Sequence, residues 1–394
     1  MNVNKDFNYA FTLSRQYMQI LGIWPDPNVP SNVFRTKMDV ILPTCILSLY
    51  IIIPQIINIF CSWGNVSQIV ELFVAANFSL MALCKIIITR YHGNKLRKLL
   101  ASIMTDWMTS KSDWERNTML KLAESGRSLS FGYYIFAIGT LLFGISLRTA
   151  FFLKNIHQPR RYLIYRFDYI QKSPNYEISW FLQLFGGTYA TISNYSIDSF
   201  ISILLLHMCG QLINLQSALN NLIEKLDNKP ISSSKFKKGI AAIIERHEHL
   251  IRCTKTINNC YSSVLFVHLL SASFQICLLT FQIFTMLTDN LNVPVIRILF
   301  FTFYSFLVLM QLYIYCYTAE RLLMESTNMV YRVYECKWYN ISVKDAKDLM
   351  IIVYRSRIPL KLSAGKFGNF SLELFAIAIK TSMGYLSALL TIRE

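Results

Sequence analysis

The chain has 394 residues, of which 53% are hydrophobic and 14% aromatic, and its mean hydropathy is +0.36. This composition is too apolar for an ordinary soluble domain and predicts an all-α, polytopic membrane protein. The formal net charge of +16 does not indicate a nucleic-acid partner. The basic residues lie mainly in the gaps between apolar stretches, where contact with anionic membrane lipid accounts for them.

Seven apolar stretches follow one another along the chain, and each approaches or exceeds the roughly 20 residues that a helix needs to cross hydrocarbon. They are 38–60, 66–89, 131–153, 178–206, 259–287, 295–318 and 368–391. We therefore expect seven transmembrane helices.

Lysine and arginine are unevenly divided between the gaps. The segments on one side of the predicted membrane hold 29 of these residues and those on the other side hold 6. By the positive-inside rule, the amino terminus is expected to be cytoplasmic and the carboxyl terminus extracellular. A G-protein-coupled receptor has the opposite orientation, so the charge distribution disfavours that class.

Apolar residues recur at helical spacing beyond the ends of several spans, with charged faces between them. This pattern occurs at 207–226, 235–257, 319–336 and 343–357. Several membrane helices are therefore expected to continue into the cytoplasm and to form a helical bundle below the bilayer.

No pattern in the sequence indicates an enzyme, a metal site or a cofactor. His247 and His249 are two residues apart and so point away from each other on a helix, which suits a solvated or interfacial role better than a shared metal. Phosphate-binding loops and nucleophile elbows are absent from the sequence.

Charge is costly within a membrane span, and several ionisable residues fall within the predicted spans. Lys85, Arg148 and Arg297 lie near span ends and are expected to extend to an interface. Asp198 is expected to cap the passage to an inner helix. Lys380 lies near the middle of the last span and has no such explanation.

The last span carries one narrow face of small, weakly polar and aliphatic residues, namely Ile377, Thr381, Gly384, Ala388 and Ile392. Such a face could line a pore that closes at a hydrophobic constriction. Small residues also permit close helix packing, and from the spacing alone packing is the more common reason for them.

Aromatic and polar residues in the outer halves of the spans could enclose a site for a small volatile or lipophilic ligand, although such residues are more often plain membrane core. The candidates are Phe73, Asn77, Leu141, Gly144, Leu147, Phe185, Tyr189, Phe300 and Tyr304.

The carboxyl-terminal third resembles the insect odorant receptor family. The resemblance rests on YRVYECKW at 331–338, RSRIPLKLSAGKF at 355–367, SLELF at 371–375 and IKTSMGY at 379–385. It extends upstream to ERHEH at 245–249 and YCY at 315–317.

The resemblance implies a ligand-gated, poorly selective cation channel, assembled as a heterotetramer with an odorant co-receptor in the plasma membrane of a sensory dendrite. Thr381, Gly384, Ala388 and Ile392 would line its pore, with Ala388 and Ile392 at the constriction. Ala388 departs from the family, which usually has a bulkier aliphatic residue there. The co-receptor's side chains would then contribute to closure.

The same resemblance divides the chain into four parts. Residues 1–37 would be a cytoplasmic segment, 38–318 six spans with an outer ligand pocket, 319–367 cytoplasmic anchor helices, and 368–394 the pore-lining helix with its tail. The short second cytoplasmic loop favours a ligand-tuned subunit over the co-receptor itself. A gustatory receptor channel is the nearest alternative, and a G-protein-coupled receptor a more distant one.

Overall fold

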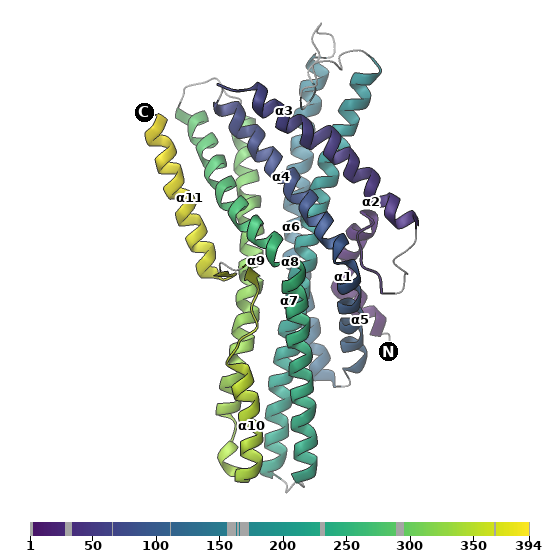
Figure 1. The fold of residues 1–394 in the computed structure, drawn as a ribbon, viewed down its shortest axis with the longest axis vertical. Helices are drawn as coiled ribbons and strands as arrows, with labels where there is room; N and C mark the ends of the chain where they lie inside the picture. Colours follow the sequence, from purple (N-terminus) through teal and green to yellow (C-terminus); the bar gives the residue numbers. More distant parts are fainter. Residues whose placement is uncertain are drawn as a thin grey trace.

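The computed structural model describes residues 3–27, 34–64, 66–110, 112–155, 163, 165, 173–228, 233–288, 295–365 and 368–393. Within these ranges, seven helices are long and apolar enough to cross a membrane, which confirms the seven predicted spans. They form one elongated bundle (Figure 1).

The elements run in chain order as α1 (Val3–Ile20), α2 (Phe34–Leu47), the π-helix η1 (Ser48–Ile52), α3 (Ile53–Cys61), α4 (Val66–Tyr91), α5 (Gly93–Thr109), α6 (Asp113–Asn155), α7 (Asn175–Asn228), α8 (Ser233–Thr288), α9 (Val295–Glu335), the 3₁₀-helix η2 (Trp338–Asn340), α10 (Val343–Ser356), β1 (Ser363–Ala364), β2 (Gly368–Asn369) and α11 (Leu372–Arg393). The sequence reasoning did not predict α1 and α5.

The first span is continuous through α2, η1 and α3, but its hydrogen bonding changes at η1. Pro54 has no backbone N–H to donate to the carbonyl one turn earlier. Just before it, the Ile53 N–H bonds to the Ser48 carbonyl, five residues back. A π turn next to a proline accommodates the missing donor without ending the span.

Four helices are much longer than a bilayer is thick, and one of them is α6, whose 43 residues measure roughly 64 Å. At about 1.5 Å per residue, the 54 residues of α7, the 56 of α8 and the 41 of α9 measure roughly 81, 84 and 62 Å. Hydrocarbon is only about 30 Å thick, so each helix extends well beyond it. We call these extensions (207–228, 233–258 and 319–335), together with α10, the stem (Figure 1).

Helix α7 lies at the centre of the bundle, and 94% of its most apolar window is buried. Its close approach to the first span requires a glycine. A Cβ at Gly186 would lie only 2.9 Å from Ile51 Cγ1.

A short hairpin joins the stem to the last span. Strands β1 and β2 pair antiparallel, with Ser363 opposite Asn369. The turn passes through Gly365 at φ +60°, and the Gly365 N–H bonds to the Ser262 carbonyl of α8 at 3.1 Å. The predicted span began at 368, but the hairpin takes up Gly368 and Asn369, and α11 starts at Leu372.

Candidate functional site

An aromatic cluster fills the bundle between α4, α6, α8 and α9, in the half away from the stem, which the predicted orientation makes the outer half. The Tyr304 ring stacks on Phe300 with centroids 6.3 Å apart and meets Phe78 edge-on at 6.1 Å. Its hydroxyl accepts a hydrogen bond of 2.6 Å from Gln275 Nε2. Phe300 in turn lies against α6, where a Cβ at Gly144 would be 3.2 Å from Phe300 Cε2. We call these five residues the outer aromatic cluster.

Two further candidates lie along the contact between α4 and α8. Asn77 Oδ1 accepts a hydrogen bond of 2.8 Å from Ser271 Oγ, and Phe73 meets Phe274 edge-on at 5.4 Å. Phe73 is 42% exposed, so it lies at the margin of the bundle rather than inside it.

The remaining candidates are spread more widely. Phe185 stacks on Tyr189 at 6.4 Å, and Tyr189 packs in the large core that includes Ile51 and Ile52 of the first span. Phe300 and Tyr304 pack against a different core. Leu141 and Leu147 are half-buried on α6. The structure thus brings together Gly144, Phe300 and Tyr304, but it places Phe185 and Tyr189 in another packing environment.

A charged cluster lies at the centre of the bundle. Asp198 of α7 accepts hydrogen bonds from Lys85 Nζ of α4 at 2.6 Å, from the Tyr133 hydroxyl of α6 at 3.2 Å, and from Gln311 and the Tyr315 hydroxyl of α9. Lys85 and Asp198 are each only 1% exposed.

The expected roles of Lys85 and Asp198 were therefore wrong. Lys85 does not reach an interface and Asp198 does not cap a helix. Both are drawn into the bundle because pairing a buried charge compensates part of its desolvation cost. Arg297 pairs instead with Glu71 and is half exposed, and the Arg148 guanidinium lies 5.9 Å from the Tyr165 ring centroid. Lys380 is exposed.

Helix α11 packs on α8 and α9 through only one side. Ala378 and Ser382 are buried, and Ser382 Oγ donates to the Ser273 carbonyl of α8 at 2.7 Å. Leu386 is half-buried against the core of α4, α8 and α9 that also contacts Phe300 and Tyr304. Only 11% of the apolar window of α11 is buried.

The face predicted to line a pore points away from this contact. Thr381, Gly384 and Ala388 are exposed, and a Cβ at Gly384 would meet no atom within 4 Å. Ile377 is 51% exposed. Ile392 belongs to the helix, but its side chain lies outside the described residues.

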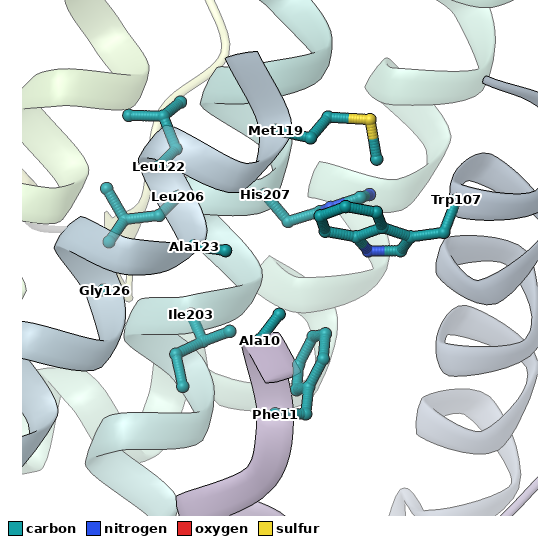
Figure 2. Close-up of a pocket in the computed structure, with 10 residues that line it drawn as sticks. All are labelled: Ala10, Phe11, Trp107, Met119, Leu122, Ala123, Gly126, Ile203, Leu206 and His207. Carbon is teal, nitrogen blue, oxygen red and sulfur yellow. The ribbon is translucent and has the colours of Figure 1, made fainter. Parts of the chain in front are cut away.

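A cavity occurs elsewhere, between α1, α5, α6 and α7 (Figure 2). Its volume is small, about 10 Å³, which is room for about one water molecule. Its lining is mostly apolar, with the rings of Trp107 and His207 6.0 Å apart on one side. Sequence reasoning missed it, because its lining comes from four helices and has no pattern within any one of them.

A second cluster of charges lies outside the predicted spans, where α5 meets the stem. Asp106 of α5 accepts hydrogen bonds from His207 Nε2 at 3.2 Å and from Arg246 Nη1 at 2.7 Å, and His249 Nε2 lies 3.5 Å from it. Burial alone would raise the pKa of Asp106, but the hydrogen bonds from His207 and His249 hold it well below its ordinary value. The bonds to Asp106 and Cys253 raise the pKa of His249 to about 9.

His247 differs from His249 on the same helix. It is only 4% exposed, so of the two expected roles, solvated or interfacial, the solvated one was wrong for this residue, and burial lowers its pKa. Among the described residues, no group of three or more metal-ligating side chains could hold a metal ion.

The fold and these clusters define a seven-span helical membrane protein with a long helical stem and one weakly packed terminal span. The chain belongs to the odorant receptor family, since the family model described as 7tm Odorant receptor matches residues 65–383.

Relatives match shorter parts of the chain. The odorant receptor co-receptor of Aedes aegypti is 27% identical over 157 residues, which are 40% of this chain and 32% of the relative. Odorant receptor 13a of Drosophila melanogaster is 23% identical over 238 residues, which are 58% of this chain and 56% of the relative. The alignments thus span about a third to about half of these relatives.

The structural similarity extends over nearly the whole chain. The insect olfactory receptor OR5 from Machilis hrabei matches with a TM-score of 0.82 at 15% identity, covering 98% of this chain and all of that one. The structure of the same receptor in complex with eugenol matches equally well, at 16% identity. At these identities the similarity establishes the fold.

Proposed function

We propose that this chain is a ligand-tuned subunit of an odorant-gated, poorly selective cation channel. The observation that carries the proposal is the low burial of α11 within its own bundle. A helix of small and aliphatic residues stands at the side of its own bundle with only 11% of its apolar window buried. A face such as that of Thr381, Gly384 and Ala388, which the chain does not use for its own packing, suits the wall of a pore completed by other subunits.

The proposed ligand is a small volatile or lipophilic molecule bound in the outer half of the bundle. The outer aromatic cluster supports this, because it offers large apolar rings and few polar groups. Tyr304 accepts from Gln275, so its own hydroxyl proton remains available to a ligand oxygen. Asn77, Phe73, Leu141 and Leu147 would form the margin of this site.

The proposed partner is an odorant co-receptor in a heterotetramer. Stem surfaces outside hydrocarbon carry large exposed apolar side chains, which is unusual for a surface in contact with water alone. Tyr334 and Tyr354 are each 76% exposed, and Ile358 is 67% exposed. Residues 319–367 would therefore act as the intersubunit anchor, and the small Ala388 would leave much of the constriction to the partner's side chains.

The proposed orientation has a cytoplasmic amino terminus and stem, an extracellular carboxyl terminus, and a location in the plasma membrane. The excess of Lys and Arg in segments 1–37, 90–130, 207–258 and 319–367 supports it. Exposed apolar residues on the first span, such as Ile57 and Phe60, would contact lipid acyl chains.

The test is co-expression with a co-receptor in cells that have no odorant response of their own, followed by an odorant panel that begins with eugenol. We expect ligand-evoked cation currents that persist in excised patches without GTP. Currents that require a G-protein cascade would contradict the channel. Currents from this chain in the absence of a co-receptor would favour the gustatory receptor alternative.

A further inference from the structure

The charged cluster at Asp198 ties together most of the bundle. Its five side chains come from α4, α6, α7 and α9, and all are buried or nearly so. Replacing a buried ion pair by well-packed apolar residues is often neutral or stabilising, so stability alone is a weak reason to keep one. Ionisable groups at such a depth are candidates for function.

Ring contacts lead from this cluster to the outer aromatic cluster. The Tyr133 ring, whose hydroxyl donates to Asp198, meets Tyr195 edge-on at 4.7 Å. Tyr195 contacts Phe78 at 6.4 Å, and Phe78 contacts Tyr304 at 6.1 Å. A ligand that displaces Tyr304 or Phe78 therefore disturbs neighbours of the Asp198 carboxylate.

Contacts in the other direction lead to the base of α11. Tyr315 donates to Asp198 while its ring lies 6.0 Å from Phe370, which is 1% exposed and stands two residues before α11 begins. The Phe370 N–H bonds to the Leu362 carbonyl at 2.9 Å, which fixes it to the hairpin. Lys85 Nζ also lies 6.0 Å from the centroid of the Tyr315 ring. Tyr315 is thus in contact with both the charge pair and the segment that leads into the last span.

His268 provides a second acceptor beside this tyrosine. Its ring meets the Tyr315 ring edge-on at 5.5 Å, it is 4% exposed, and neither ring nitrogen has a hydrogen-bond partner among the described residues. A buried polar group without a partner requires an explanation. A shift of α9 against α8 that brought the Tyr315 hydroxyl to a ring nitrogen of His268 would give this tyrosine a second hydrogen-bonded arrangement.

We infer that Asp198, Lys85 and Tyr315 are positioning residues that couple ligand occupancy in the outer half of the bundle to the position of α11. The inference rests on the proposed function. Without ligand, the Tyr315 hydroxyl is hydrogen-bonded to Asp198 and the Tyr315 ring packs against Phe370. Ligand in the outer aromatic cluster moves Tyr195 and Tyr133, which weakens the hydrogen bond between Tyr315 and Asp198. The contact of Tyr315 with Phe370 then loosens, and the base of α11 can move.

The first test replaces the charge pair as a unit. Removing one partner alone would leave an uncompensated buried charge, whereas Lys85→Met with Asp198→Asn keeps both side-chain sizes. The amide that replaces the carboxylate keeps one oxygen, which accepts up to two hydrogen bonds from Tyr133, Gln311 and Tyr315, and its NH₂ group can donate to a tyrosine oxygen. The double variant is co-expressed with the co-receptor. Its surface amount, the ligand-induced rise in melting temperature of the solubilised complex, and its currents are measured with eugenol, or with the strongest agonist of the panel.

We expect a ligand-induced melting shift within a factor of two of wild type, and a maximal evoked current per surface channel at least tenfold lower, or an equally large rise in ligand-independent current. An unchanged maximal current with an unchanged concentration dependence would overturn the inference. Absence of current from the wild-type pair would instead overturn the proposed function, so the two failures are distinguishable.

The second test is Tyr315→Phe, which removes the hydroxyl but keeps the ring against Phe370. Its matched control is Tyr91→Phe, an exposed tyrosine at the end of α4. We expect Tyr315→Phe to change the ratio of ligand-free to ligand-evoked current at least fivefold while ligand binding persists, and Tyr91→Phe to leave that ratio unchanged. Equal behaviour of the two variants would overturn the role of Tyr315.

Discussion

Helices α7 and α11 have nearly the same mean hydropathy in their most apolar windows, 1.5 and 1.4, yet 94% of the first window and 11% of the second are buried. Hydropathy therefore recognises both as spans but does not distinguish the centre of the bundle from its margin. Helix α7 carries polar groups that bond to neighbouring helices, such as Asp198, Ser199 and the NH₂ group of Asn194. Helix α11 has small residues facing outward, away from the rest of the bundle, and the proposed pore-lining role accounts for this.

The largest difference is expected from removing a charge in each helix. Asp198→Leu leaves the Lys85 ammonium buried without its partner, which costs roughly 3–5 kcal/mol and should abolish surface expression. Lys380→Leu in α11 removes an exposed charge and should preserve the surface amount within about twofold. Surface biotinylation of both variants beside the co-receptor measures this. Similar surface amounts would mean that the ion pair does not hold the bundle together.

Shortening an apolar side chain should also destabilise α7 more than α11, with a smaller loss of stability than the removal of a charge. Phe200 is fully buried in α7 and contacts the rings of Phe11 and Trp24. Phe200→Ala should cost about 3 kcal/mol, mainly through the cavity it leaves. Leu372→Ala, at a residue 40% exposed on α11, should cost less than about 1 kcal/mol. Melting temperatures of the purified complexes test this, and a larger loss at Leu372 would contradict the described packing of α11.

The stability of the charge cluster where α5 meets the stem should depend on pH. The pKa of Asp106 is lowered on folding, so its contribution to stability is complete above about pH 4 and is lost as the pH falls from there towards the lowered pKa. The pKa of His249 is raised to about 9, so its contribution is complete below about pH 6.5 and is lost as pH rises through 9.

We therefore expect the solubilised protein to lose about 1 kcal/mol of stability between pH 6.5 and 9.5 through His249, allowing for its partial exposure. His249→Gln should remove that alkaline loss, while Arg252→Gln, at an exposed pair on the same helix, should retain it. An alkaline loss of equal size in the His249 variant would show that another group is responsible.

The smallest effect is expected at the contact between α11 and the bundle. Leu386 is half-buried against the core of α8 and α9. Leu386→Ser should therefore lower the stability of this packing by about 1 kcal/mol and reduce surface expression modestly. Ala388→Ser, on the exposed face, should leave expression unchanged. Quantitative surface labelling compares the two, and a greater loss at Ala388 would reverse the assigned faces.

The sequence was sufficient for the spans and for the long helices of the stem, because hydropathy and helical spacing are properties of continuous segments. It was insufficient for the contacts between segments. Lys85 and Asp198 are 113 positions apart in the sequence. Their positions within the predicted spans placed each of them near a membrane interface. Only the packing of four helices decides that their side chains meet inside the bundle.

The candidate ligand residues show the same limit. Helical spacing placed Phe300 and Tyr304 on one face of their helix. That Gly144 lies opposite them is seen only in the packing of α6 against α9. Phe185 and Tyr189 were also placed in an outer half, but α7 turns Tyr189 towards the first span. The two-residue strands before α11 are too short to show any periodicity.

The central claim, that α11 lines a pore with its exposed face, is tested most directly by cysteines placed one at a time at Leu386, Ala388 and Ile392. The wheel separates 386 from 388 by about 160°. Each variant is co-expressed with a co-receptor and exposed to a water-soluble thiol reagent with and without ligand. We predict fast modification and altered current at 388 and 392 during ligand application, and slow modification at 386. Equal modification at all three positions, or modification at 386 alone, would contradict the account.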